Sequence, residues 1–101
     1  MSIRDIPGKS NDGDEFHVID VSGPTRLVFI KAIEDIIINT PDGDLFIGWD
    51  YASPEDFTPD NCMLIGPKDN MKEIAKERCT HFYMMPREAE KTLRVYVTVQ
   101  K

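Results

Sequence analysis

The sequence predicts an all-β domain, either a compact antiparallel β-sandwich or a small jelly-roll-like barrel, with room for one short helix near residues 70–78. Three observations carry this prediction. Short apolar runs rich in β-branched and aromatic residues recur, turn residues separate them, and the last run alternates apolar with polar side chains. Because 101 residues suffice for one modest core, we expect a single domain over residues 16–101.

Residues 1–15 are expected to form an arm outside that core. They are rich in turn formers and hold only two apolar anchors, Ile3 and Ile6. Chain ends are commonly disordered unless something ties them down. The arm is therefore predicted to be flexible or to become ordered on a neighbouring subunit, with Ile3 and Ile6 as its contact residues.

The first strands are predicted over residues 16–21 and 25–32, separated by a Ser-Gly-Pro break. Residues 33–40 and 45–49 are the next two apolar runs, with the turn sequence Pro-Asp-Gly-Asp at residues 41–44 between them. A short turn cluster between two strong strand formers is typical of a β-hairpin. We therefore predict that these two strands pair with each other.

A polar loop is predicted over residues 50–61, because Pro54 and Pro59 do not fit inside a central strand. Residues 62–65 resume an apolar run, which a Gly-Pro step ends.

Residues 69–79 allow two interpretations. Asn70 could cap a short helix with Glu73 as its capping-box partner, and an irregular or extended connection is the alternative.

The chain is predicted to close with two strands, over residues 80–85 and 91–100, joined by a charged turn over residues 86–90. The last strand alternates with a period of two, so that one of its faces should lie in the core. The core residues expected on that face are Leu93, Val95, Val97 and Val99.

Composition argues against several classes of partner. The formal net charge is −6, whereas a nucleic-acid surface needs clustered Lys and Arg. No apolar run is long enough to span a bilayer, and the N-terminus does not resemble a signal peptide. Cys62 and Cys79 lack metal-site spacing and are expected to be reduced. We expect no nucleic-acid or membrane binding.

No motif predicts catalysis. His17 and His81 each fall within an expected strand without a nearby nucleophile in a recognised motif, so local pairing is the simpler interpretation. Asp42, Asp44 and Asp50 surround a turn but do not match a calcium-loop pattern. The sequence therefore predicts a protein that is not an enzyme and has no cofactor and no metal.

The most suggestive residues for binding are Trp49, Tyr51 and Phe57, at a strand end and in the loop that follows. Trp and Tyr are enriched at interfaces because they bury much area and keep a polar group. The alternative is that these rings close one end of a small sandwich.

Four segments carry a resemblance to a known group of proteins. They are NTPDGDLFIG at residues 39–48, MLIGP at residues 63–67, HFYM at residues 81–84 and LRVYVTV at residues 93–99. In this order, residues 33–101 resemble the small β-sandwich structural proteins of tailed-phage virions. The resemblance implies a capsid decoration protein, a head-fibre base, a head-closure part or a tail protein, and it supplies no catalytic or ligand residue.

The leading hypothesis is a non-enzymatic structural protein of a bacteriophage virion, made in the host cytoplasm. Its partners would be a major capsid, tail or connector protein and copies of itself, with a trimer as one candidate state. Two alternatives come from other classes. Trp49 and Tyr51 could stack on host-surface carbohydrate, or the acidic chain could inhibit a protein by covering its basic surface.

Overall fold

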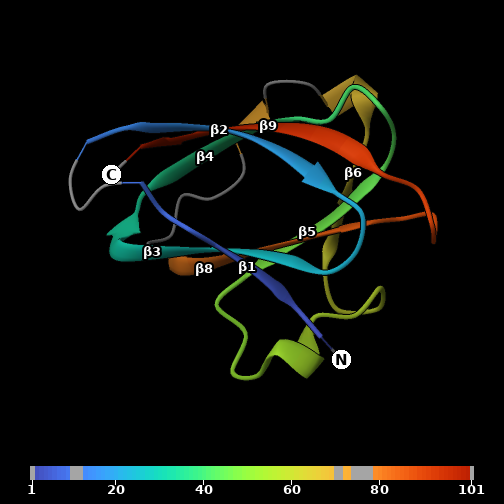
Figure 1. Ribbon diagram of the computed structural model, residues 1–101, viewed down its shortest axis with the longest axis horizontal. Helices are drawn as coiled ribbons and strands as arrows, with labels where there is room; N and C mark the ends of the chain where they lie inside the picture. The colour runs from blue at the N-terminus through green and yellow to red at the C-terminus, as the bar shows by residue number, and fades with distance from the viewer. Residues whose placement is uncertain (1, 10–12, 70–71, 74–78, 101) are drawn as a thin grey trace.

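In the part of the chain that this computed structural model describes, residues 2–9, 13–69, 72–73 and 79–100, nine strands form two sheets (Figure 1). Sheet A contains, in spatial order, β1 (Arg4–Pro7), β3 (Thr25–Ile33), β8 (Cys79–Pro86), β5 (Leu45–Trp49) and β6 (Met63–Ile65). Sheet B contains β2 (Glu15–Val21), β9 (Leu93–Gln100), β4 (Asp35–Asn39) and β7 (Lys72–Glu73). Two short 3₁₀ turns, η1 (Pro54–Asp56) and η2 (Pro67–Asp69), lie in connections. The prediction of an all-β sandwich is confirmed.

The strands pair in a nested order. β5 pairs with β6, β4 with β7, β3 with β8 and β2 with β9, all antiparallel. The chain therefore runs as one long antiparallel ribbon that is folded over, so that β9 also pairs with β4 and β8 with β5. Two sheets ordered in this way are those of an eight-stranded jelly roll, with β1 added at one edge of sheet A.

One apolar core fills the space between the two sheets. Strand β9 buries alternate residues as the sequence predicts, and β2, β3, β4 and β5 contribute their inward-facing side chains from both layers. Burying each such side chain stabilises the fold by roughly 1.5–3 kcal/mol relative to leaving it in water. Fully buried core residues include Val21, Leu27, Ile36, Ile38, Leu45, Ile47, Leu93, Val95, Val97 and Val99.

The hairpin predicted between residues 33–40 and 45–49 is wrong. β4 lies in sheet B and β5 in sheet A, so residues 40–44 carry the chain from one layer to the other. The Oγ1 of Thr40 donates a 2.8 Å hydrogen bond to the carbonyl of Gly43, which tightens this connection. Turn chemistry alone cannot distinguish an arch between sheets from a hairpin within one; the better partner for β4 is the long strand β9.

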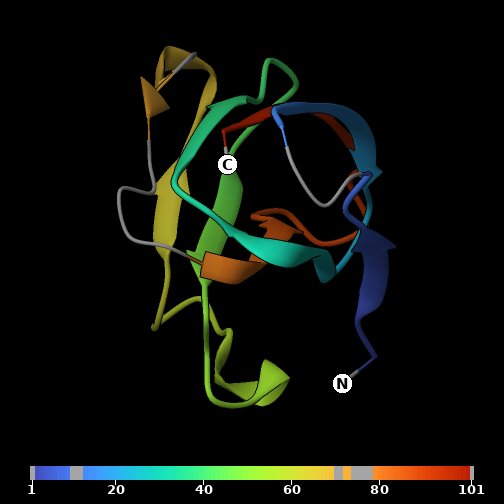
Figure 2. The ribbon, with the colours of Figure 1, turned by 90° about the vertical axis from the view of Figure 1, so that its left-hand side faces the viewer.

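Residues 4–7 differ from the expected arm. They form β1, which pairs in parallel with Thr25 to Val28 of the same chain, and Ile6 packs against the core. The backbone N–H of Gly8 extends the contact with a 2.7 Å bond to the carbonyl of Val28. This first strand therefore belongs to the domain, and Figure 2 shows it along one side of the sandwich.

The helix considered near residues 70–78 falls mostly outside the described residues. Of that stretch the structure describes only Lys72–Glu73, which form β7 and pair with β4. Within the described ranges no helix has the length and apolar character of a membrane span.

Candidate functional site

The three aromatic residues singled out in the sequence lie in or beside the loop over residues 50–61. This loop projects from one end of the sandwich, on the side where the N-terminus lies (Figures 1 and 2). Trp49 is half-buried at the end of β5, where its ring stacks on Phe82 at 6.3 Å with an interplanar angle of 15°. One ring face of Trp49 is therefore occupied by the core.

Tyr51 and Phe57 cover the outer face of sheet A instead of projecting into solvent. Together with Tyr83 of β8 they form a cluster in which ring centroids lie 5.1 to 5.7 Å apart. Phe57 is fully buried and Tyr83 is 1% exposed. Phe57 therefore holds the loop on the sheet, and contact with a partner would require the loop to open.

Gly48 explains why the tyrosine ring can lie so close to the strand. A Cβ added at Gly48 would meet Cε2 and Cζ of Tyr51 at 2.6 and 2.7 Å. The missing side chain leaves room for the ring, and burial there raises the pKa of the Tyr51 hydroxyl. That hydroxyl donates a hydrogen bond to the carbonyl of Asn61, which ties the two ends of the loop together.

Polar side chains fix the rest of the loop. Asp50 adopts a left-handed φ of 53°, and its Oδ1 accepts bonds of 3.2 Å from the backbone N–H groups of Thr80 and His81. Ser53 and Asp56 form a capping box around η1, with Asp56 Oδ2 accepting from the N–H of Ser53 at 3.2 Å. The loop is therefore anchored by its own side chains.

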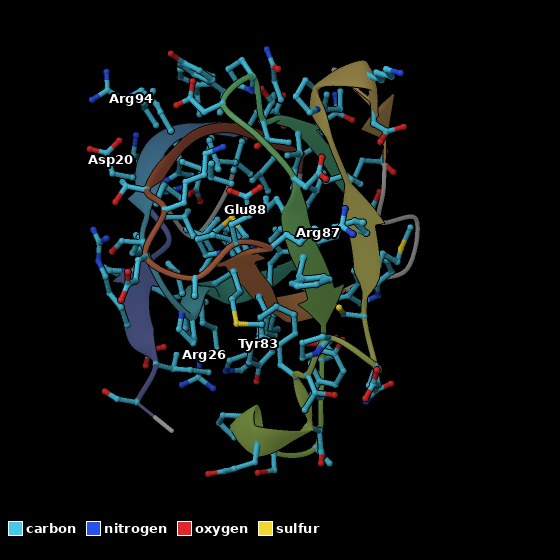
Figure 3. All side chains as sticks on the ribbon, turned by 90° about the vertical axis from the view of Figure 1, so that its right-hand side faces the viewer. Asp20, Arg26, Tyr83, Arg87, Glu88 and Arg94 are labelled. Carbon is cyan, nitrogen blue, oxygen red and sulfur yellow. The ribbon has the colours of Figure 1, made fainter. Side chains whose placement is uncertain are left out.

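An ion pair borders the aromatic cluster. Arg26 of β3 donates to both carboxylate oxygens of Asp5, at 2.7 and 2.9 Å, and to the hydroxyl of Tyr83 at 3.3 Å. Figure 3 shows Arg26 beside Tyr83. These bonds hold the pKa of Asp5 below its usual value and raise the pKa of Arg26. The side chain of Asp5 thereby fastens β1 to sheet A.

The N-terminal contact residues predicted from the sequence do not share this site. Ile6 faces the interior of the sandwich and packs against the core, opposite Leu27. Ile3 is half-buried next to the start of β1.

Two grooves lie close to the loop. The first, which we call the Trp49 groove, has a volume of about 260 Å³ and is lined by Ile47, Gly48, Trp49, Tyr51, Asn61, Cys62 and Met63. It brings together two of the residues predicted for carbohydrate stacking. Asn61 also lines it, but its Nδ2 already donates a 2.9 Å bond to the carbonyl of Asp56. Asp50 likewise uses Oδ1 on two backbone N–H groups.

The second groove, which we call the Phe46 groove, has a volume of about 340 Å³ and lies on the outer face of sheet A. Phe46 of β5 and Met85 of β8 are cross-strand neighbours on its floor. Pro24, Pro59 and Pro86 line its apolar walls, and the turn over residues 87–90 forms a charged rim.

Sequence reasoning missed this second groove. An outward-facing Phe46 was implied by its place between two inward-facing residues, Leu45 and Ile47, because side chains alternate along a strand. The signal was therefore present, but the identity of the neighbour Met85 depends on strand pairing.

The two histidines are paired locally. His17 is buried, and its Nε2 lies 2.8 Å from Oε1 of Glu15, which also accepts from the N–H of Lys9 at 2.7 Å. The Nδ1 of His81 lies 2.9 Å from Oγ1 of Thr80.

Both cysteines are free thiols. Cys62 is partly exposed and Cys79 is buried, and burial raises the pKa of Cys79 to about 12. The thiol of Cys79 therefore stays protonated at neutral pH.

The turn aspartates act as backbone and side-chain anchors. Asp42 accepts a 3.0 Å bond from the N–H of Arg94, and Asp44 accepts a 2.9 Å bond from Nη1 of Arg87. Among the described residues no group of His, Cys, Asp and Glu side chains is arranged to hold a metal ion.

No protein-family model, no curated protein and no solved structure matches this chain.

Proposed function

We propose that the protein is a non-enzymatic structural component of a virion, a capsid decoration or similar assembly module that binds a protein lattice and copies of itself. The Phe46 groove is the observation that carries this proposal. Its floor and walls are apolar, and charged side chains stand at its rim, which is the anatomy of a protein–protein interface.

The charges around the groove support partner binding over chemistry. Arg87 at the rim is paired with Asp44 at 2.9 Å, and the pair is partly exposed. Oε2 of Glu88, in the same turn, lies 3.9 Å from Nζ of Lys91. Arg87 and Glu88 are thus engaged in ion pairs, so what the groove offers a partner is its shape and its apolar area.

The fold is compatible with the proposed role. Jelly rolls occur in viral capsid proteins and in lectins, so the strand order alone does not choose between a lattice protein and a sugar-binding one. The apolar floor of the Phe46 groove favours a protein partner, because carbohydrate sites need free hydrogen-bonding groups beside the rings.

Particle purification tests this proposal. Virus-like particles from the organism that encodes the chain are banded on a density gradient, and the protein is quantified by mass spectrometry. We expect the protein to be present in the banded particles, and its absence from them would contradict a virion role.

A rebinding experiment with stripped particles tests the groove itself. Phe46→Thr, which keeps a strand-forming residue, should weaken binding about 30-fold if Phe46 is a hot spot worth about 2 kcal/mol. Ile30→Thr is the matched control, since Ile30 is 75% exposed on β3 of the same sheet but does not line the groove. Equal binding by both variants would exclude the Phe46 groove as the contact.

A carbohydrate-binding function is the second candidate, and the Trp49 groove is the observation that favours it. Trp49 and Tyr51 both line this groove, so a sugar ring bound there would contact both aromatic side chains. Trp49 is the only tryptophan, so tryptophan emission, excited selectively over the three tyrosines, reports on this groove alone. A saturable emission change on adding host-surface glycans would support this function, and an unchanged spectrum would exclude stacking on Trp49.

A further inference from the structure

The outer face of sheet B carries apolar side chains where a solvent-facing sheet would carry polar ones. Phe16 and Val18 of β2 are each 52% exposed. Across the sheet, Phe16 lies in register with Thr98 of β9 and then Ile37 of β4. The ring of Phe16 also stacks on Tyr96 at 6.4 Å with an interplanar angle of 20°.

These residues form a continuous patch, which we call the sheet B patch, and it consists of Phe16, Val18, Ile37, Tyr96 and Thr98. β2 buries every second residue, so Phe16 and Val18 occupy its outward positions. Outward positions of a sandwich normally alternate as polar residues. Thr98 and Asn39 interrupt the two rows across the strands, but four large apolar or aromatic side chains on one outer face are better explained by a covering surface than by exposure to water.

The charges on this face indicate what covers it. At one end Asp20 and Arg94 neutralise each other through a 3.0 Å ion pair, and Figure 3 shows them together at a corner of the molecule. The register places Asp35 at the opposite end, beside Gln100. Between these ends the described outward side chains of β2, β9 and β4 carry no charge.

We infer that the sheet B patch binds a second copy of this chain, face to face. Each copy carries a formal charge of −6, so two copies repel each other over most approaches. A neutral, apolar face is where that repulsion is weakest. A basic partner would instead gain from an acidic face, and this patch offers none.

The open edge of β2 favours contact through the face over extension of the sheet. Lys9 donates its Nζ to the carbonyl of Phe16, and Nη1 of Arg4 donates to the carbonyl of Asp20 at 2.9 Å. Two acceptors at the edge are thus occupied by side chains of the preceding segment, which hinders the addition of another strand. Sheets that pack by their faces lie about 10 Å apart and leave such edges untouched.

The size of the patch sets the strength of the contact. Three strands spaced about 4.8 Å apart and the seven residues of β2 rising about 3.4 Å each give the whole outer face that carries the patch a projected area of roughly 350 Å² per copy, which is an upper limit for the contact. Stable interfaces bury about 800 Å² per partner, so the dimer should be reversible, with a dissociation constant in the micromolar range. This inference deepens the proposed function and rests on it for one step. Neighbouring copies bound to the same lattice have a local concentration of about millimolar, which is enough for a weak dimer contact to form.

Sedimentation velocity of the purified chain, from roughly 5 μM to 500 μM, tests the contact. We expect a monomer–dimer equilibrium that tightens as salt is raised, because salt screens the repulsion between acidic copies. A chain that stays monomeric throughout would overturn the inference, as would a dimer that salt weakens.

Substitutions locate the contact. The double variant Phe16→Thr and Val18→Thr keeps strand-forming residues on β2 and should weaken dimerisation at least ten-fold. Ile30→Thr, on the other sheet, should leave it within about two-fold. If the double variant melts at a lower temperature, Val18→Thr alone is used, with an expected loss of at least three-fold. Equal weakening by Ile30→Thr would refute the sheet B patch.

The two proposals fail separately. A monomer in solution that is nevertheless abundant on banded particles would refute the dimer and keep the virion role. A protein that dimerises in solution but is absent from the particles would refute the virion role and keep the dimer.

Discussion

Replacing Phe57 by alanine decides between its two interpretations, a partner contact and a structural anchor. The ring is fully buried, and its centroid lies 5.4 and 5.7 Å from those of Tyr83 and Tyr51. Burial of this kind makes Phe→Ala cost about 3–5 kcal/mol, and each aromatic pair adds about 0.5–1.5 kcal/mol beyond area burial. Because a surface loop can partly collapse into the space, we expect about 3 kcal/mol.

That loss is large for a domain of this size. A 101-residue chain is held by about 5–15 kcal/mol, and 1 kcal/mol shifts its melting temperature by roughly 4–8 °C. The variant should therefore melt roughly 12–24 °C lower. In urea its midpoint should fall by roughly 1.5–3 M, for an m-value of about 1–2 kcal/mol per molar.

Urea titration followed by far-UV circular dichroism and by Trp49 fluorescence measures this loss. Ala52→Ser is the matched control, because Ala52 is exposed in the same loop and should change stability by less than about 0.5 kcal/mol. A Phe57→Ala loss below about 1 kcal/mol would mean that the ring is not packed on sheet A. Phe57 would then be available to a partner, as the sequence first suggested.

Three further predictions concern the same sheet and the two thiols. Asp5→Asn should cost less than about 1 kcal/mol at pH 7, because the pair with Arg26 is partly exposed. The hydrogen bonds from Arg26 lower the folded pKa of Asp5, so the stability that the pair contributes is present above about pH 4 and is lost as the pH falls toward 2. The difference between the urea midpoints at pH 6 and pH 3 should therefore be smaller for Asp5→Asn than for the unsubstituted protein. An equal difference in both proteins would contradict this role of the ion pair. Gly48→Ala should lower the unfolding free energy by about 1–3 kcal/mol in thermal melts, because the added methyl group displaces the tyrosine ring above it; a neutral effect would show that the ring moves freely. In a thiol-reagent assay at pH 8, Cys62 should react in the native protein and Cys79 only in denaturant, so two fast native thiols would be evidence against burial of Cys79.

The sequence predicted local features well and spatial partners poorly. The alternation of Leu93, Val95, Val97 and Val99 identified β9 and its buried face, because a period of two depends only on neighbouring residues. The turn at residues 41–44 was also recognised. Its flanking strands were assigned to each other wrongly, since the choice of β9 over β5 as the partner of β4 is made by the whole core.

The candidate site shows the same division. Trp49, Tyr51 and Phe57 were recognised as a group, and the structure does bring them to one end of the sandwich. That Phe57 is buried depends on Tyr83, which lies 26 residues further along the chain. The Phe46 groove needed the pairing of β5 with β8, which no local pattern contains.

The nested strand order has a consequence for how the chain reaches this fold. β5 and β6 are close in sequence, whereas the outermost pair joins Glu15 to Val99. Closing long loops costs entropy before any contact repays it, so chains dominated by such pairs fold in milliseconds to seconds. We expect β5 and β6 to pair first and the other strand pairs to follow outward, with β2 and β9 last. The strand that carries Phe16 and Val18 would then be among the last to form, so an intermediate would leave the edge of β9 that pairs with β2 open and prone to pair with another chain.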